Sequence, residues 1–405
     1  HSRPYDPNQY DIAEALLRPV RYTPGRPWPA DTGNGILRIP IIVSNNSDEP
    51  VTDAFVSFTL EQAAPDFDWS GIAPTALCLK TAGDLDLPWQ LDDFDGRLDR
   101  QDEICLAVRS LPAQENQTFF LYINRTTNLP QTAAAIDCTP LDHGFRIANP
   151  HIRLEKTETD GDFLDAFYYQ EVLLGRYNPV IWQQNQGQNF WTHADRFIGA
   201  QISRGPLRIL LHLTAAGGDP ATIASTDKTV VPLAFQVEHR LAVYPDRPWF
   251  EARFVRLTNR SSRPLYLHGA FFYTMSNIAG DSKDDILLPQ VPNYYLGNFN
   301  LWHDPTGYEY GALAPEEGNL LVRFYVNEQG GQHPDAQLHF NPPLTINPAD
   351  QAACFDSPAL AVFGFYQEQE NETGLPVDLW KQISQSFRLT SHFFPAEHPP
   401  TPTAP

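Results

Sequence analysis

The run from residue 230 to residue 275 constrains the fold of this chain more than any other part of the sequence. It reads VVPLAFQVEHRLAVYPDRPWFEARFVRLTNRSSRPLYLHGAFFYTM. Segments rich in Val, Phe, Leu and Tyr are separated by YPDRP and NRSSRP, which are turn sequences. The run therefore predicts antiparallel strands joined by short turns. The 37 prolines of the chain agree with this prediction, because an interior proline costs a helix about 3 kcal/mol.

Strand and turn patterns continue through most of the chain. Several apolar runs between residues 36 and 125, among them ILRIPIIV and TFFLYINR, predict a β-sandwich over residues 1–135, with a short helix at 10–18. Longer strand patterns over residues 136–392 predict a larger antiparallel sandwich. Residues 393–405 are rich in Pro and Thr and predict an extended tail. The expected fold class is therefore all-β.

Composition limits the partners of the chain. Lys and Arg number 28 against 49 Asp and Glu, which gives a net charge of −21 and argues against a nucleic-acid partner. No apolar run approaches the roughly 20 residues of a membrane-spanning helix, so no membrane span is expected. The four cysteines follow no metal-binding spacing, and Cys78 and Cys105 are candidates for a disulfide or for buried thiols. The tail is typical of linkers in secreted proteins, so we expect a secreted or periplasmic location.

The segment LPWQLDDFDGRLDRQDEICL at 87–106 holds a dense group of acidic residues. Clustered carboxylates around a glycine supply the oxygen ligands that Ca²⁺ prefers. An EF-hand alignment on Gly96 places Leu91 at the first ligand position, so the segment is not an EF-hand. One interpretation is a Ca²⁺ site, and the other is a solvated acidic turn. The candidate ligands are Asp93, Asp95, Asp99 and Glu103.

Two stretches, 168–197 and 293–313, combine aromatic side chains with amides, His and Arg. Neither keeps a clean period of 2 or 3.6, so we predict long structured loops, which in compact β-proteins are often functional. Flat rings suit the apolar faces of sugars, and amides and Arg suit their hydroxyl groups. The competing interpretation is that the rings pack the loops onto the core. The candidate substrate-binding residues are Trp191, Trp302, Asn189, Arg176, Tyr308 and Tyr310.

Three other histidines occupy predicted strands. His239 falls on the same alternating face as Phe235, Val237 and Leu241, which predicts a hydrogen-bonded core histidine, and His212 is interpreted in the same way. His268 lies on the side opposite Leu265 and Leu267 and is a secondary candidate for a ligand-binding cleft.

Parts of the sequence resemble known carbohydrate-active proteins. VSNNSDEPVTDAFVSFTL followed by LPWQLDDFDGRLDRQDEICLAVRSLPAQENQTFFLYIN resembles their accessory β-sandwich, and HGFRIANPHIRLEK with the 230–275 run resembles the galactose-mutarotase-like supersandwich. Aldose epimerases share that fold with the β-domains of several polysaccharide lyases and glycoside hydrolases. The resemblance implies an N-terminal β-sandwich followed by a supersandwich whose concave sheet holds an oligo- or polysaccharide.

The resemblance also implies a chemistry. A polysaccharide lyase abstracts the proton next to a uronate carboxylate with a His or Tyr base while a cation neutralises the carboxylate. We expect His193 as base or acid, Tyr295 as its partner and Arg196 as the carboxylate clamp, with His303 as a further catalytic candidate. A glycoside hydrolase would instead need two carboxylates, for which Glu171, Glu309 and Asp195 are the candidates. An aldose epimerase or a non-catalytic glycan-binding protein would also be compatible with this fold.

Overall fold

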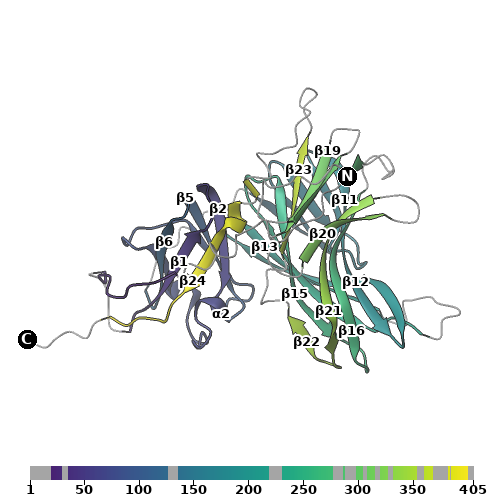
Figure 1. The fold of residues 1–405 in the computed structure, drawn as a ribbon, viewed down its shortest axis with the longest axis horizontal. Coiled ribbons are helices and arrows are strands. Elements are labelled where there is room, and N and C mark those ends of the chain that lie inside the picture. Colours follow the sequence, from purple (N-terminus) through teal and green to yellow (C-terminus); the bar gives the residue numbers. More distant parts are fainter. Residues whose placement is uncertain are drawn as a thin grey trace, which may run out of the picture. The chain divides into compact units, whose positions relative to one another are not determined.

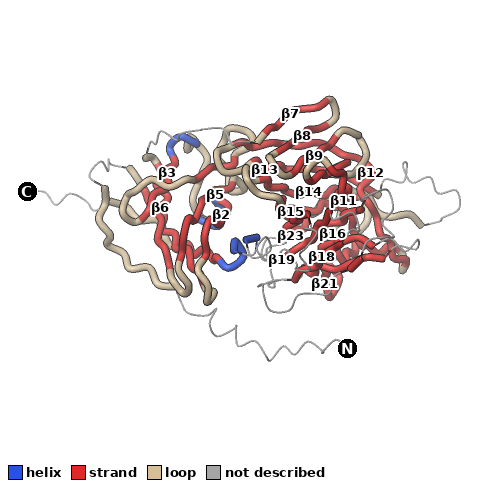
Figure 2. Tube along the Cα trace, turned by 90° about the horizontal axis from the view of Figure 1, so that it is seen from above, coloured by secondary structure: helices blue, strands red, loops and turns tan. Residues whose placement is uncertain are grey.

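The computed structural model divides the chain into two compact units, residues 1–132 with 385–405, and residues 133–384 (Figure 1). It describes residues 20–29, 35–125, 136–218, 230–276, 286–287, 298–303, 308–314, 320–326, 332–353, 360–367, 382–383 and 385–399. From residue 271 to 341, and at some later strand positions, this description covers the backbone and not the side chains. The helix expected at 10–18 lies outside the described residues. Strands predominate in both units, which confirms the all-β prediction (Figure 2).

The first unit contains two antiparallel sheets. The order of one is β24-β1-β6-β3, formed by Leu389–Phe393, Leu37–Asn45, Asn116–Ile123 and Leu77–Thr81, and the order of the other is β2-β5-β4, formed by Val51–Thr59, Glu103–Leu111 and Trp89–Asp92. Short helical turns complete the unit: α2 (Leu60–Ala63), η2 (Pro74–Ala76) and η4 (Ser386–Arg388). Alternate residues of both sheets, such as Ile39, Ile41, Ile104 and Leu106, are fully buried in one cluster, as expected of a sandwich.

The C-terminal segment belongs to the first unit and differs from the predicted boundaries. β24 pairs with β1, with Phe393 opposite Ile41, although 389–392 was expected in the second region. Part of the predicted extended tail, at Glu397, also binds to this unit. The backbone N–H of Glu397 donates to the Arg38 carbonyl at 2.8 Å, and its carboxylate pairs with buried Arg38 Nε at 2.6 Å. The sequence pattern shows that 389–393 is strand-like, but it does not reveal a partner strand at the other end of the chain.

The cysteines of the described residues are free thiols. Cys78 lies in β3 of one sheet and Cys105 in β5 of the other, and both are buried. The disulfide hypothesis for this pair is therefore wrong, and the buried-thiol hypothesis is confirmed. Burial raises the pKa of the Cys78 thiol to about 11, so this thiol is protonated and unreactive at neutral pH.

The second unit is built from two large antiparallel sheets. The first sheet contains β7 (Asp137–Leu141), β8 (Gly144–Ala148), β9 (Ile152–Lys156), β10 (Leu164–Tyr169), β11 (Val172–Asn185), β16 (Leu265–Ser276), β20 (Leu320–Val326) and β21 (Gln332–Ile346). The second contains β13 (Ile209–Gly217), β14 (Phe235–Val243), β15 (Trp249–Asn259), β18 (Asn298–His303), β19 (Tyr308–Ala314), β22 (Gln351–Ala353) and β23 (Leu360–Gln367). The short strand β17 (Ile286–Leu287) pairs with β18.

Strand β12 (Gln188–Arg204) belongs to both sheets of the second unit. Its first half pairs with β11, from Gln188 to His193, and its second half pairs with β13, from Ala194 to Arg204. The register with β13 shifts between Ala194 and Arg196 and again between Phe197 and Gly199. Bulges of this kind bend a strand and change the direction of its side chains. The segment 194–199 is thus the corner where β12 passes from one sheet to the other.

The core of the second unit lies between its two sheets. Ile181 of β11 and Leu213 and Leu241 of the opposite sheet are fully buried in one cluster. Across this core, Tyr177 Oη and His239 Nδ1 lie 2.6 Å apart, and both residues are buried. Burial, with a smaller contribution from His212, lowers the pKa of His239 to about 3, so its ring is neutral. The prediction of a hydrogen-bonded core histidine is confirmed.

In the part of the chain that the structure describes, no helix has the length and apolar character needed to cross a membrane.

Candidate functional site

Two tryptophans lie face to face across the β11–β12 hairpin. Trp182 of β11 is the register partner of Trp191 of β12, and their ring centroids are 5.5 Å apart with planes inclined by 6°. Cross-strand aromatic pairs stabilise antiparallel strands. Trp191 nevertheless remains 48% exposed. The stack therefore leaves about half of the Trp191 side chain open to solvent.

His268 extends this stack onto β16. Trp182 faces Gly269 in the β11–β16 register, whereas Gln183 faces Leu267, so His268 is the extra residue of a bulge. The bulge places the His268 ring 4.8 Å from the Trp182 ring, with planes inclined by 27°. We call the three stacked rings of Trp191, Trp182 and His268 the aromatic platform. His268, the secondary candidate from the sequence, thus lies at this surface.

Polar groups border the aromatic platform on the side of the hairpin turn. Gln184 Nε2 donates to Asn189 Oδ1 at 3.4 Å, across the same two strands. Tyr266 of β16 is opposite Gln184 and is 45% exposed. Thr345 of β21 is exposed beside Tyr266 in the register. The surface therefore combines ring faces with amide and hydroxyl groups that can donate and accept hydrogen bonds.

The segment 168–197 was predicted as a long loop, and this prediction is wrong. Its residues form β10, β11 and β12, and β11 joins β12 through Gln186 and Gly187, whose φ values of 51° and 78° match a tight hairpin turn. The alternation was obscured because polar residues are buried and aromatic residues are exposed. Gln183 Nε2 donates to the Leu233 carbonyl at 3.1 Å, and Gln183 Oε1 accepts from the Leu233 N–H at 2.9 Å.

The outer face of β11 continues from the aromatic platform toward a group of ionisable side chains. Arg176, Asn178 and Val180 precede Trp182 at every second position, so they share its face. His193 is exposed and lies opposite Val180. Each step of two residues spans about 7 Å, so His193 lies one step from the platform and Asn178 lies two. The predicted residues His193, Arg176 and Asn189 therefore occupy one face with Trp191.

Three carboxylates meet next to Asn178. One oxygen each of Asp160, Asp162 and Asp165 can be chosen so that all lie within 4.8 Å of one another. The fully buried Lys156 ammonium lies 2.6 Å from both Asp160 Oδ1 and Asp165 Oδ1. Lys156 therefore already supplies a positive charge to this group. The sequence analysis did not select these residues, because a single Lys among acids in LEKTETDGDFLD gives no local signal that it is buried.

Two of these carboxyl groups have pKa values displaced in opposite directions. Burial raises the pKa of Asp162 to about 6, although the Asn178 hydrogen bond opposes this rise. Burial acts on Asp165 as well, but hydrogen bonds from Lys156 and from two backbone N–H groups bring its pKa below the usual value. The Arg176 guanidinium lies 3.8 Å from Asp162 Oδ2. Near pH 6 the Asp162 carboxyl group is thus about half protonated, while its neighbour Asp165 is ionised.

The remaining predicted catalytic and binding residues lie elsewhere. Arg196 is at the β12 corner and lines a pocket of the second sheet. Tyr295 lies outside the described residues. Four other candidates lie in strands for which the backbone alone is described: Trp302 and His303 in β18, and Tyr308 and Tyr310 in β19. Their predicted roles stay predictions.

The acidic segment 92–103 uses its carboxylates to bind its own backbone. Asp93 Oδ1 accepts from the N–H groups of Asp95 and Gly96 at 2.9 and 2.8 Å, and Asp99 Oδ1 accepts from Gln101 N–H at 2.6 Å. Glu103 is buried in β5. Within the described ranges, Asp93, Asp95, Asp99 and Glu103 do not form a group with the spacing of metal ligands. Ca²⁺ binding at this segment stays a prediction.

Among comparisons with known proteins, similarity was found to solved structures and not to family models or curated sequences. No protein-family model and no curated protein matches the chain. A glycosyl hydrolase family 38 protein from Enterococcus faecalis superposes with a TM-score of 0.48 at 11% identity, covering 88% of this chain and 47% of that protein. An alpha-mannosidase from Enterococcus faecalis V583 gives 0.41 at 11% identity, covering 88% and 46%. This chain spans about half the length of each.

Proposed function

We propose that the protein is a carbohydrate-active protein that binds a saccharide on the aromatic platform. The observation that carries this proposal is the stack of Trp191, Trp182 and His268, of which Trp191 is 48% exposed. An aromatic ring that is open to solvent, as Trp191 is, favours contact with the C–H faces of pyranose rings, while Gln184 and Asn189 offer hydrogen bonds to sugar hydroxyls. The substrate class implied is a neutral or acidic oligosaccharide.

The competing explanation for the stack is stabilisation of the hairpin alone. Cross-strand aromatic pairs contribute roughly 0.2–1 kcal/mol to a sheet without any ligand. That explanation accounts for the contact between Trp182 and Trp191 but not for the exposure of the Trp191 ring. Large exposed apolar surfaces on soluble proteins commonly mark binding sites.

Binding is tested by titrating the full chain with a panel of oligosaccharides and following tryptophan fluorescence and heat. Trp191→Ala is expected to weaken binding at least tenfold while changing the free energy of unfolding by less than about 1 kcal/mol. Leu85→Ala is the matched control, because Leu85 is an exposed apolar residue of the first unit. Unchanged saccharide affinity in Trp191→Ala would refute the platform as the binding site.

The enzymatic form of the proposal is hydrolysis of a glycosidic bond, with β-elimination as its rival. Hydrolases need one carboxylic acid that stays protonated near its working pH and one ionised carboxylate. Asp162, with a pKa of about 6, and ionised Asp165 supply that contrast within a few ångströms of each other. Asp162 is only 5% exposed, so its role as general acid requires the loop 157–163 to admit substrate.

Asp162→Asn tests this role. If Asp162 is the general acid, release of reducing ends should fall at least a hundredfold, and wild-type activity should decline as the pH rises through about 6. Stability gives an independent readout. Because the folded pKa exceeds the usual 3.8, the stabilising contribution of Asp162 is present below about pH 4 and is lost as the pH rises to about 6. Asp162→Asn should remove that loss.

Asp246 is exposed, so Asp246→Asn is the matched control for both the hydrolytic activity and the pH dependence of stability. If Asp162→Asn keeps full hydrolytic activity but loses the pH dependence of stability, Asp162 is a structural residue. Absorbance of an unsaturated uronate product, without reducing ends from neutral glycans, would instead favour the lyase.

A further inference from the structure

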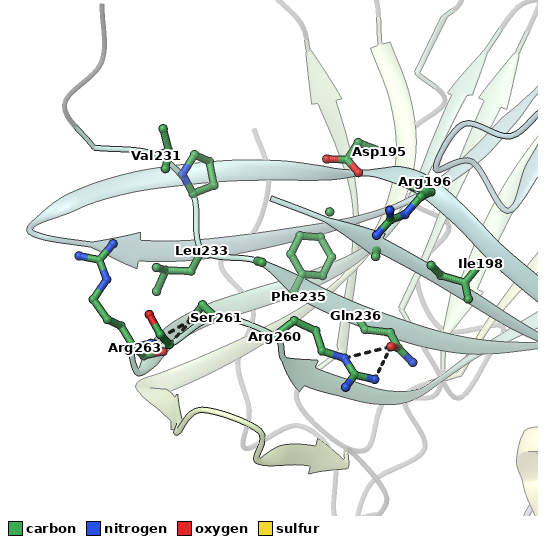
Figure 3. Close-up of a pocket in the computed structure, with 15 residues that line it drawn as sticks. Asp195, Arg196, Ile198, Val231, Leu233, Phe235, Gln236, Arg260, Ser261 and Arg263 are labelled. Carbon is green, nitrogen blue, oxygen red and sulfur yellow. Dashed lines mark hydrogen bonds between the residues drawn. The ribbon is translucent and has the colours of Figure 1, made fainter. Parts of the chain in front are cut away.

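A pocket of about 580 Å³ lies at the corner of the second unit where β12 passes between the sheets (Figure 3). Its walls come from β12, from the end of β13, from the segment 231–236 that leads into β14, and from the turn 260–263 between β15 and β16. None of its lining residues belongs to the aromatic platform.

Three guanidinium groups line this pocket, against the single carboxylate of Asp195. Figure 3 shows Arg196 and Arg260 toward one end and Arg263 at the other, with Leu233 and Phe235 between them. Arg260 is held by Gln236 Oε1, which accepts from Nε at 3.1 Å and from Nη2 at 2.5 Å. Among the residues that the structure describes, the guanidinium groups of Arg196 and Arg263 have no hydrogen-bond or ion-pair partner. A local excess of positive charge thus exists in a protein whose net charge is −21.

The floor of the pocket is rigid. The segment 231–234 is fixed to β11 by the two hydrogen bonds between Gln183 and Leu233 and by Asn185 Nδ2, which donates to the Val231 carbonyl at 2.8 Å. Gly217 closes the end of β13 against this segment, since a Cβ there would meet the Phe235 ring at 2.8 Å. Preorganised walls reduce the entropic cost of holding a ligand.

The backbone of the arginine turn is equally fixed. Arg260 N–H donates to the Ala234 carbonyl at 3.0 Å, which joins the turn to the floor. The Arg263 carbonyl accepts from Asn259 Nδ2 at 2.7 Å and from Ser261 Oγ at 2.8 Å. Arg196 projects from the first bulge of β12, and bulges commonly re-aim side chains toward binding sites. The three arginines therefore start from defined positions around one cavity.

We propose that this pocket binds an oxyanion, that is, a carboxylate, sulfate or phosphate group, between Arg196 and Arg260, with Arg263 placed to hold a second anionic or hydroxyl group. Guanidinium groups bind such anions through parallel N–H···O hydrogen bonds, more strongly than they bind neutral acceptors. The apolar surface of Leu233 and Phe235 between the charged ends suits the body of a small molecule, such as the ring of an acidic sugar. The competing explanation is that the arginines are solvated surface residues with no ligand.

The test uses the full chain at constant ionic strength, balanced with NaCl. Isothermal titration and thermal unfolding are measured with sodium sulfate, phosphate, glucuronate and, as the neutral probe, glucose. The altered protein is Arg196→Gln with Arg263→Gln, whose side chains have no partner to lose among the described residues. Arg109→Gln, at an exposed position of β5 in the first unit, is the matched control. Circular dichroism verifies that each variant is folded.

We expect saturable binding of at least one oxyanion, a dissociation constant at least tenfold higher in the double variant, and no change in Arg109→Gln. Equal affinity for inorganic anions and glucuronate identifies a free oxyanion as the ligand, whereas a clear preference for glucuronate identifies an acidic saccharide. Absence of saturable binding by every anion, or equal binding in the double variant, overturns the proposal. Because sulfate and phosphate contain no sugar ring for the platform to contact, their affinity tests the pocket independently of the platform.

Discussion

The turns at residues 45–50 and 259–264 have the same construction, although they belong to different units of the molecule. Each begins with a buried asparagine, Asn45 or Asn259, and ends at a proline, Pro50 or Pro264. The asparagine Oδ1 accepts from the serine two positions later, at 2.7 Å from Ser47 Oγ and 2.6 Å from Ser261 Oγ. The asparagine Nδ2 donates to the carbonyl that precedes the proline, at 2.8 and 2.7 Å. The pattern Asn-x-Ser-x-x-Pro therefore forms the same hydrogen-bonded turn at both places.

We call the hydrogen bonds made by the asparagine and serine side chains of each turn its frame. The two turns differ at the open positions, whose side chains take no part in this frame. The first carries Asp48 and Glu49, and Glu49 Oε2 accepts from the Arg388 guanidinium of its own unit at 2.9 Å. The second carries Arg260 and Arg263, both of which line the pocket. The asparagine and serine of each turn hold its backbone, whereas the other positions determine its charge. One frame supports an internal ion pair in one unit and the proposed anion site in the other.

The largest effect is expected from removing the asparagines. Asn45 Nδ2 donates to the carbonyls of Glu49, Leu111 and Pro112, and Asn259 Nδ2 donates to those of Arg263 and Ile346. Asn45→Ala and Asn259→Ala leave these carbonyls without a donor, so each should lower the free energy of unfolding by about 3 kcal/mol. Urea unfolding measures the loss. The control is Asn46→Ala, which changes the half-buried asparagine next to Asn45. A loss below about 1 kcal/mol at either site would show that the two frames are not equivalent.

The next largest effect is expected from exchanging the charged side chains of the second turn while its asparagine and serine are kept. Arg260→Asn with Arg263→Glu gives the second turn the residues of the first at the matching positions. We expect anion affinity at the pocket to fall at least tenfold, or about 1.4 kcal/mol, with a loss of unfolding free energy of less than about 1 kcal/mol. The reverse exchange, Asn46→Arg with Glu49→Arg, should create no anion binding in titration calorimetry. Gain of binding there would contradict the view that the pocket, and not the turn, supplies the site.

The sequence predicted the fold well because alternation and turn chemistry are local signals. The 230–275 run forms β14, β15 and β16 with turns where YPDRP and NRSSRP stand. The position of β24 was not predictable, since its partner β1 lies at the opposite end of the chain. The β11–β12 hairpin was missed because Gln183 and Asn185 face inward to bind the 231–233 backbone, which breaks the apolar alternation.

The candidate site was predictable in part for the same physical reason. Trp191 was expected to stack on a sugar ring; it is 48% exposed, and its stacking role stays a prediction. Its stack with Trp182 and His268 depends on strand register and on a bulge, neither of which a local pattern contains. Likewise, Arg196 and the arginines of the 260–263 turn come from distant segments, so only the folded chain brings them to one pocket.

Removing the serine hydroxyls tests whether the two frames are of equal strength. Ser47 Oγ donates to the Glu49 carbonyl at 2.9 Å, and Ser261 Oγ donates to the Arg263 carbonyl at 2.8 Å. Ser47→Ala and Ser261→Ala should each lower the free energy of unfolding by about 1 kcal/mol, because the asparagine Nδ2 still satisfies that carbonyl. Ser261→Ala should in addition weaken anion binding two- to threefold, since the Arg263 backbone becomes less constrained. Equal anion affinity before and after the substitution would mean that the frame does not position Arg263.

The smallest effect is expected at the open positions of the first turn. Glu49 pairs with Arg388, but its side chain is 63% exposed, whereas that of Arg388 is 8% exposed. Solvent and salt screen the exposed Glu49 carboxylate, and a glutamine oxygen can still accept a hydrogen bond from Arg388, so Glu49→Gln should lower the free energy of unfolding by no more than about 0.5 kcal/mol. The loss should shrink further when urea unfolding is repeated in about 1 M NaCl. A loss near that of Asn45→Ala would instead mean that the charged position is part of the frame, and the distinction drawn between the two turns would fail.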